Sequence, residues 1–562
     1  MTRATVEQAL ESLEEWTDEM LVGQLFSVAS GDHTARDIMG FGNGANEEAQ
    51  LRAHERLKQQ IRDYHLGGII YFPPGDKHEP VANIRQDMLD LQDVASVPLL
   101  IATDQENGTV ARIQVGVEHL PGAMALAAAD NPVLTKRVGY ATGEQLRSGA
   151  IFQTYAPVAD VNVVPSNPSI NVRSPGSDPQ TAARHVATEV QAFSDGGVAS
   201  TLKHFPGYGS ATVDPHHGLP LILLTREEWN ATERLPFQEG IKAGADSVML
   251  AHALFPALDP NNAATFSPAI VRDLLRNELG FDGVIVTDAM EMGGAARSEG
   301  PAEACVLALQ AGVDQILMPA DLPEAYEAVL AALKDGRLDR TELQESARRI
   351  LELKLKLGLD SPSLPTSATV DSIDHAALAA EVAAASIALR DPSQKPFLAE
   401  NSAVLLIHPG VDPQRRGANP GDIIAPILEQ TGHHVKQIVW GNEGDLPIDL
   451  EEFALADTEV SRDAVIVLRD AWKSHLPVTD LLDSLFAAGV KANVIVTRSP
   501  FEASTVQRDC PVVFSYGDNA YALEAAARVV AGVEAPNGIL PMPVTDLETS
   551  AKASNAAMEN LY

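Results

Sequence analysis

The sequence predicts an α/β protein that begins with a (β/α)₈ TIM-like barrel. Short apolar runs rich in β-branched residues recur along the first two-thirds of the chain, at intervals of about 30–55 residues that fit strand–loop–helix units. Because these runs are apolar without alternation, we expect parallel strands that are buried on both faces. A doubly wound open sheet is the alternative arrangement. The expected strands are residues 68–72, 98–103, 155–161, 199–204, 247–252, 284–287 and 315–318.

Helical patterns separate these strands, for example at residues 179–194 and 268–279. A strong amphipathic pattern over 339–358 predicts the helix that closes the barrel. The Pro/Ser-rich stretch 360–367 predicts a linker, and an Ala-rich helix is expected at 375–389. Five further apolar runs then predict a smaller α/β sandwich domain. They are residues 403–407, 435–440, 464–468, 492–496 and 512–516.

Domain boundaries follow from these patterns. The catalytic barrel is predicted at residues 1–359, the linker with its helix at 360–390, and the sandwich domain at 391–550. The last four residues, 559–562, resemble the start of a viral protease cleavage site. We therefore expect residues 551–562 to derive from a tag.

The composition is that of a folded globular chain with a large excess of acid. Hydrophobic residues make up 45% and charged residues 21%, which argues against disorder. Asp and Glu number 77 against 41 Lys and Arg, so the formal net charge is −36. This charge argues against a nucleic-acid partner and against attachment to anionic lipid. Two distant cysteines, Cys305 and Cys510, exclude a disulfide framework and a cysteine metal site. The polar first 20 residues and the lack of a long apolar run predict a cytoplasmic protein without a membrane span.

One block, residues 203–218, concentrates groups that can carry chemistry. Lys203, His204, His216 and His217 place four cations or potential cations within it. The first pair ends a predicted strand, and in a barrel that end carries the catalytic face. The Pro-Gly-Tyr-Gly turn that follows can bring His216 back over the barrel mouth. The alternatives are ordinary loop histidines, or a metal site that includes a nearby Asp.

Asp214 and His216 lie two residues apart in this block. An Asp close to an imidazole orients the ring and raises its proton affinity, which suits a general acid–base. The alternative is a turn aspartate that makes an Asx-type hydrogen bond.

Charged side chains also follow other predicted strands. Asp104 and Asp288 each come directly after one, so each is either a helix N-cap or a catalytic group at the barrel mouth. His252 closes another strand, and the alternative there is a core histidine. Arg173 carries the weakest signal of this group. Together these side chains suit a polyhydroxylated neutral ligand, because sugar hydroxyls need both donors and acceptors.

Six blocks of the chain together resemble family 3 of the glycoside hydrolases. They follow the family's order and cover most of residues 60–320. The second domain resembles the α/β sandwich that follows the barrel in many members, and residues 534–541 are similar to the loop that ends it. The six blocks are residues 103–108, 155–162, 203–207, 244–249, 286–290 and 311–314.

The resemblance implies a role for each candidate residue. Asp288 matches the nucleophile of a retaining mechanism that passes through a covalent glycosyl-enzyme. The triplet that holds Asp214 and His216 resembles the Asp-x-His element of the β-N-acetylglucosaminidase branch, which implies His216 as acid/base and Asp214 as its dyad partner. Neither a metal nor a cofactor is implied. The implied substrate-binding residues are Asp104, Arg112, Arg173, Lys203, His204, Met249 and His252.

A histidine acid/base changes which acceptor can approach the intermediate. A carboxylate there repels an anion, whereas an imidazole does not. We therefore expect a phosphorylase that uses inorganic phosphate and releases a sugar 1-phosphate. The near alternative is an exo-acting β-N-acetylglucosaminidase or β-glucosidase that uses water. More distant alternatives are a non-catalytic sugar-binding protein and a metal-dependent barrel hydrolase.

Two departures from the family pattern leave the sugar open. Tyr208 stands where the pattern has His, and Asn107 and Thr109 interrupt the Asp-Gln-Glu-Gly-Gly-Arg pattern. Both changes alter subsite polarity, so glucose and N-acetylglucosamine are both expected candidates. The expected ligands are a small glycoside and phosphate, and the second domain either shapes the acceptor side or mediates a homodimer.

Overall fold

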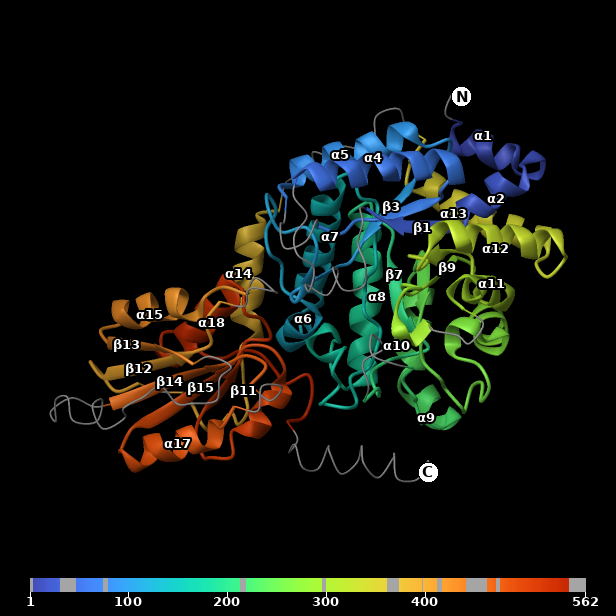
Figure 1. The fold of residues 1–562 in the computed structure, drawn as a ribbon. Helices are drawn as coiled ribbons and strands as arrows, with labels where there is room; N and C mark the ends of the chain where they lie inside the picture. Colours follow the sequence, from blue (N-terminus) through green and yellow to red (C-terminus); the bar gives the residue numbers. More distant parts are fainter. Residues whose placement is uncertain are drawn as a thin grey trace.

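The computed structural model describes residues 4–30, 47–73, 79–212, 219–295, 300–360, 373–396, 398–411, 417–440, 462–471 and 476–544. Within these ranges the chain is an α/β protein in which strands and helices alternate (Figure 1).

Eight strands of the described N-terminal part pair in parallel. Five form one sheet in the order β10-β1-β2-β3-β6, and three form another in the order β7-β8-β9. Isolated parallel bridges join the edges of the two sheets, from Gln153 to Ala199, from Val158 to Lys203 and from Val286 to Gln315. The strands are β1 (Phe26–Ala29), β2 (Gly68–Ile70), β3 (Leu100–Thr103), β6 (Gln153–Thr154), β7 (Thr201–Phe205), β8 (Ser247–Leu250), β9 (Val284–Thr287) and β10 (Ile316–Leu317).

Six of the seven predicted strands are therefore confirmed, and the closed (β/α)₈ barrel is met only in part. The prediction at 155–161 is wrong: the strand lies just before it, at Gln153–Thr154, and Val158 makes only an isolated bridge, because Pro157 has no N–H to donate to a ladder. Strand β1 was not predicted. The order of neighbours returns from β9 through the Val286–Gln315 bridge to β10 and β1. At the junctions, however, the ladders shrink to single bridges among the described residues. What is established is an α/β fold of parallel strands whose carboxyl ends share one side.

Helices cover these strands, and their capping residues explain where they begin. Asp178 accepts a hydrogen bond from the Thr181 N–H at 2.8 Å and starts α8, and Asp339 caps α13 in the same way. The predicted helices at 179–194 and 339–358 are confirmed, and the pattern at 268–279 forms a π-helical segment, Ala269–Glu278. The helices are α1 (Val6–Glu11), α2 (Asp18–Gln24), α4 (Glu47–Tyr64), α5 (Val81–Val94), α6 (Ala123–Ala129), α7 (Pro132–Ser148), α8 (Pro179–Asp195), α9 (Arg226–Ala231), α10 (Arg234–Lys242), α11 (Pro301–Ala311), α12 (Leu322–Lys334) and α13 (Arg340–Lys356).

A six-stranded sheet follows the linker helix α14 (His375–Ser386). Its strand order is β11-β16-β15-β14-β12-β13, parallel except for the β11–β16 pair. In Figure 1, α15 and α18 cover one face of this sheet and α17 covers the other. The elements are β11 (Ala388–Leu389), β12 (Ala403–His408), α15 (Pro420–Gln430), β13 (His434–Val439), β14 (Arg462–Leu468), α17 (Val478–Ala487), β15 (Lys491–Val496), β16 (Val512–Phe514) and α18 (Ala520–Val530).

The two parts of the chain share packing contacts. Met124 of α6 and Val172 belong to the same buried cluster as Tyr516 and Met542. The Ile539 N–H donates to the Ala128 carbonyl at 2.9 Å. The second part is therefore packed against the segment that carries Arg173, while the exact domain boundaries stay a prediction. A search of the described residues found no helix with the length and apolarity to span a membrane.

Candidate active site

The carboxyl ends of the parallel strands bring the candidate residues together. Asp104 follows β3, Lys203 and His204 lie near the end of β7, and Asp288 follows β9. The hydroxyl of Tyr155 links the two sides of this group: burial raises its pKa, and the charges of both Asp104 and Asp288 raise it further. The charges of both carboxylates therefore act on one buried ring.

Lys203 occupies the middle of a buried network of charges. Its Nζ lies 2.7 Å from Asp104 Oδ1 and 2.6 Å from Glu106 Oε1. Arg173 forms a two-point ion pair with Glu106, from Nε and from Nη2, each at 2.8 Å. Arg112 lies on the outer side of Asp104, with Nη2 at 3.7 Å from Oδ2. Four of the predicted substrate-binding residues therefore belong to one network, in which an additional carboxylate, Glu106, joins Lys203 to Arg173.

The ion pairs decide the charge states in this network. Burial alone would raise the pKa of Glu106, but Arg173 and Lys203 outweigh it and hold that pKa far below its ordinary value. The pKa of Asp104 is also lowered, because Lys203 and Arg112 outweigh burial. Burial lowers the pKa of Lys203, yet Asp104 and Glu106 raise it overall. All of these groups are therefore charged at neutral pH.

His204 is oriented by a fully buried aspartate, Asp160. The His204 Nδ1 lies 2.8 Å from Asp160 Oδ2, and the His204 backbone N–H donates to Oδ1 at 3.1 Å. A carboxylate accepts, so Nδ1 carries a proton. In the neutral ring Nε2 is then an acceptor, which suits a sugar hydroxyl.

Asp288 is partly exposed at the end of β9. Its Oδ1 accepts a hydrogen bond from the Ala289 N–H at 2.8 Å. The next described helical turn is Gly293–Ala295, which Asp288 does not cap. The sequence left two interpretations open for Asp288, a helix N-cap or a group at the strand ends. Since Asp288 caps no described helix, the second interpretation is the one that agrees with the structure.

His252 lies beneath Asp288 with both ring nitrogens already bonded. Nδ1 is 2.8 Å from Thr265 Oγ1, and Nε2 is 3.2 Å from the Ala289 carbonyl, which can only accept. Burial lowers the pKa of His252 even though the Asp288 charge opposes the shift. The geometry therefore matches the core-histidine alternative: the ring supports the turn after Asp288, and its predicted contact with substrate is not favoured.

Two other predicted residues line the same region through apolar contacts. Met249 on β8 is buried in a cluster with Tyr155 and Phe72. The Arg112 guanidinium lies over the Phe72 ring at 4.9 Å, and the Arg112 N–H donates to Gln105 Oε1 at 2.9 Å. These contacts fix the direction from which Arg112 reaches Asp104.

The predicted acid/base dyad, Asp214 and His216, lies outside the described residues, as does His217. Its geometry therefore stays a prediction, and so does the metal-site alternative that used the same histidines.

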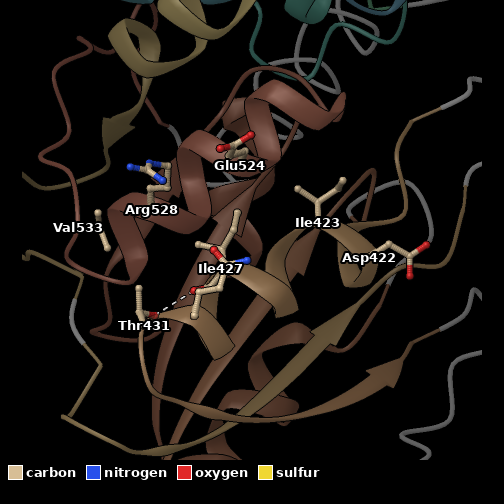
Figure 2. Close-up of a pocket in the computed structure, with 8 residues that line it drawn as sticks. Asp422, Ile423, Ile427, Thr431, Glu524, Arg528 and Val533 are labelled. Carbon is tan, nitrogen blue, oxygen red and sulfur yellow. Dashed lines mark hydrogen bonds between the residues drawn. The ribbon is translucent and has the colours of Figure 1, made fainter.

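A pocket lies elsewhere, between α15 and α18 of the second part (Figure 2). Its lining includes Asp422, Glu524 and Arg528, and the Thr431 hydroxyl on its rim donates to the Ile427 carbonyl at 3.1 Å. Arg528 is already paired with Glu534. None of the candidate catalytic residues lines this pocket.

Sequence reasoning missed Glu106 and Asp160, although both lie inside blocks that it had singled out. Glu106 stands two positions after Asp104 in an extended segment, so both side chains are on one side of the chain. That spacing was the available signal.

The Glu106 network generates a stability prediction. Glu106→Gln leaves Lys203 and Arg173 without their shared carboxylate, and we expect a loss of about 3–5 kcal/mol in the free energy of unfolding at neutral pH. Because the folded-state pKa of Glu106 is lowered, this difference is present above its ordinary pKa of 4.5 and shrinks as the pH falls below that value. Urea denaturation at several pH values measures it.

The matched control is Glu278→Gln. Glu278 also pairs with two arginines, Arg226 and Arg234, but its side chain is 41% exposed. We expect a loss below about 1 kcal/mol there. Equal losses for the two variants would contradict the importance assigned to the buried network.

Comparisons with known proteins agree on one family. Residues 19–353 match the model of the glycosyl hydrolase family 3 N-terminal domain. β-Hexosaminidase A of Pseudoalteromonas piscicida is 38% identical over 361 residues, which cover 59% of this chain and 60% of that protein. A β-hexosaminidase of Stenotrophomonas maltophilia is 36% identical over 275 residues, which cover 45% of this chain and 81% of that protein.

Solved structures extend the similarity over almost the whole chain. A family 3 β-N-acetylglucosaminidase of Paenibacillus sp. is 31% identical with a TM-score of 0.80, covering 94% of this chain and 99% of that one. A β-glucoside phosphorylase has a TM-score of 0.78 at 21% identity, covering 96% of each chain, and shares the fold. Because the family model spans more than half of the residues, this protein belongs to family 3 of the glycoside hydrolases.

Proposed function

We propose that this protein is a retaining, exo-acting glycosidase that releases β-linked N-acetylglucosamine or glucose, with water as the acceptor. One observation carries the proposal: Asp288, a partly exposed carboxylate, stands at the same strand ends as the Asp104–Lys203–Glu106–Arg173 network. The relatives named β-hexosaminidase and β-N-acetylglucosaminidase support the same reaction class.

Substrate binding would use the fixed donors and acceptors of the network. Asp104 offers carboxylate oxygens to sugar hydroxyls, and Lys203 and Arg173 offer N–H groups whose directions are set by Glu106. In its neutral form, His204 adds an acceptor nitrogen, Nε2. Such a mixture holds a neutral polyol without a net charge on the ligand. It would place the anomeric carbon toward Asp288.

The reaction would then proceed by two displacements. Asp288 attacks the anomeric carbon, the bond to the leaving oxygen breaks, and His216 protonates that oxygen. Water next attacks the anomeric carbon from the face that the leaving group vacated. His216 takes its proton, the new C–O bond forms, and the ester bond to Asp288 breaks. Two inversions give net retention. The roles of His216 and Asp214 in this scheme rest on the sequence resemblance.

The choice of water rests on the charges of the described residues. The cations Lys203, Arg173 and Arg112 lie beside Asp104 and Glu106, while Asp160 and Asp288 add two more carboxylates. Three cations face four carboxylates, so the described site offers no excess positive charge to an anion. The sequence had favoured phosphate because an imidazole acid/base does not repel an anion, whereas the charges of the described residues favour water.

Phosphorolysis remains the second candidate, for one reason. The proposed acid/base, His216, is an imidazole, which does not repel an anionic acceptor as a carboxylate would.

We also propose that the parallel strands form a closed (β/α)₈ barrel. Both candidate functions use this arrangement.

The nucleophile assignment gives the second prediction. Asp288→Ala is expected to lower kcat by about 10⁴-fold or more on aryl β-N-acetylglucosaminide and aryl β-glucoside, because no covalent intermediate can form. Release of aryl alcohol measures the rate, and the unfolding curve checks the fold. Asp282→Ala is the control, since Asp282 is exposed at the other end of β9 and is expected to leave the rate unchanged. Activity retained by Asp288→Ala would overturn the assignment.

The product gives the third prediction. With millimolar phosphate present, we expect free sugar of retained β-configuration, the same rate as in chloride of equal ionic strength, and full activity with a chelator. NMR of the first product identifies the sugar and its anomer. A sugar 1-phosphate would favour phosphorolysis, inversion would overturn the retaining mechanism, and binding without turnover would favour a sugar-binding protein.

A further inference from the structure

The last described stretch of the second part, residues 539–544, lies against a loop of the first part. We call it the terminal stretch. Its Pro541 carbonyl accepts a hydrogen bond from the Ser177 N–H at 3.1 Å. The Met542 side chain is only 2% exposed, and its Sδ accepts from Asn162 Nδ2 at 3.7 Å. One short stretch of the second part therefore binds two neighbouring segments of the first.

The two main chains approach each other so closely that the loop needs a glycine. Gly176 has φ +137°, and a Cβ there would lie 2.3 Å from the Pro541 carbonyl oxygen. No L side chain fits into that space unless one of the two backbones moves. The position of the loop is therefore fixed relative to the terminal stretch.

Arg173 stands in the same loop, between two anchored neighbours. On one side, Val172 belongs to the buried cluster that also contains Met542 of the second part. On the other side, the Ser174 hydroxyl donates to the Asp160 carbonyl at 2.7 Å. The backbone around Arg173 is thus held from the second part and from the first part at once.

The direction of the Arg173 guanidinium depends on this backbone. Its Nε and Nη2 form the two-point pair with Glu106, and its Nη1 donates to the Ser169 carbonyl at 3.0 Å. A planar guanidinium holds its N–H groups in one rigid fork, so a shift of the loop would disturb all three bonds together. The side chain stays 20% exposed, so a ligand can reach it.

We propose that Met542 is a positioning residue for sugar binding: it holds the loop so that the Arg173 guanidinium meets the sugar hydroxyls in one fixed direction. The inference rests on the proposed function, in which Arg173 donates to those hydroxyls. Met542 itself touches no substrate and acts through Arg173. The second part thereby takes part in binding the sugar, beside the two roles that the sequence left open for it.

The experiment measures kcat and KM on aryl β-N-acetylglucosaminide and aryl β-glucoside. For Met542→Ala we expect KM to rise about 10-fold and kcat to stay within about twofold, because a displaced Arg173 loses binding that substrate and transition state share. Met542→Leu conserves most of the volume and is expected to bring KM back to within about twofold of the unmodified protein. If Met542→Ala does not fold, Met542→Val, which removes less volume, takes its place.

A double-mutant cycle tests whether Met542 acts through Arg173. Arg173→Ala leaves Glu106 paired with Lys203 at 2.6 Å, so the buried carboxylate keeps a cation. In that background we expect Met542→Ala to change KM by less than about twofold, because the group that it positions is gone. A rise as large as in the unmodified protein would overturn the inference.

The matched control is Leu485→Ala. Leu485 is fully buried in the same cluster as Met542, but it belongs to α17 rather than to the terminal stretch. We expect a comparable fall in the urea midpoint of unfolding and an unchanged KM. Equal rises in KM for the two variants would mean that any loosening of the second part weakens binding, and would overturn the specific role of Met542.

The outcomes distinguish the inference from the proposed function. A raised KM in Arg173→Ala together with an unchanged KM in Met542→Ala would overturn the inference alone. An unchanged KM in Arg173→Ala would overturn the sugar contact of Arg173, and the inference with it. No turnover by the unmodified protein would overturn the proposed function. The dissociation constants of N-acetylglucosamine and glucose, measured by calorimetry, would then replace KM with the same expectations.

Discussion

The site at the strand ends depends on a single buried carboxylate. Glu106 separates Lys203 from Arg173, two cations that would otherwise repel each other away from water. Its strongly lowered pKa keeps it charged at neutral pH. With Asp104 and Glu106 occupying two of the three Lys203 donors, one N–H remains for a further partner. In the proposed function, recognition of sugar hydroxyls would therefore use a geometry that exists before substrate arrives, which reduces the ordering cost of binding.

A second pair of buried acids organises the neighbouring loop. Asp160 holds the His204 ring and the Tyr208 N–H, and Glu233 lies against the two glycines of the Pro-Gly-Tyr-Gly turn. Strand β7 supplies Lys203 and His204, and its continuation leads directly into the segment that bears the predicted acid/base. In the proposed function, this short stretch of backbone would connect sugar recognition with proton transfer. A shift in this stretch would move both functions together, because packed backbone transmits displacement rather than absorbing it.

The strands and the strand-end residues could be predicted from sequence because their signals are local. Residues 284–287 form an unbroken apolar run, and Asp288 follows it, so both position and exposure were predictable. Glu233 lacked any local signal, since its partners lie in other segments of the chain. His252 shows what a local signal leaves open. A histidine at a strand end is equally consistent with substrate binding and with a structural role in the core, and only the hydrogen bonds of its two ring nitrogens distinguish the two roles. Closure of the barrel depends on inter-strand bridges that no single run encodes.

In the proposed mechanism, the choice of acceptor depends on the charge of the glycosyl-enzyme intermediate rather than on that of the free protein. Once Asp288 is esterified it is neutral, so three cations face three carboxylates among the described residues instead of four. Esterification therefore removes one negative charge at the moment when an acceptor approaches. The repulsion felt by phosphate becomes weaker, but the described residues still offer it no net attraction.

The two acceptors also require different protonation states of His216. Water must lose a proton and needs a neutral imidazole as base, whereas phosphate arrives already ionised and needs none. A histidine that has just protonated the leaving group is left neutral, which is the state that water requires. The net charge of −36 adds a long-range repulsion against phosphate alone, so both the local and the global electrostatics favour hydrolysis.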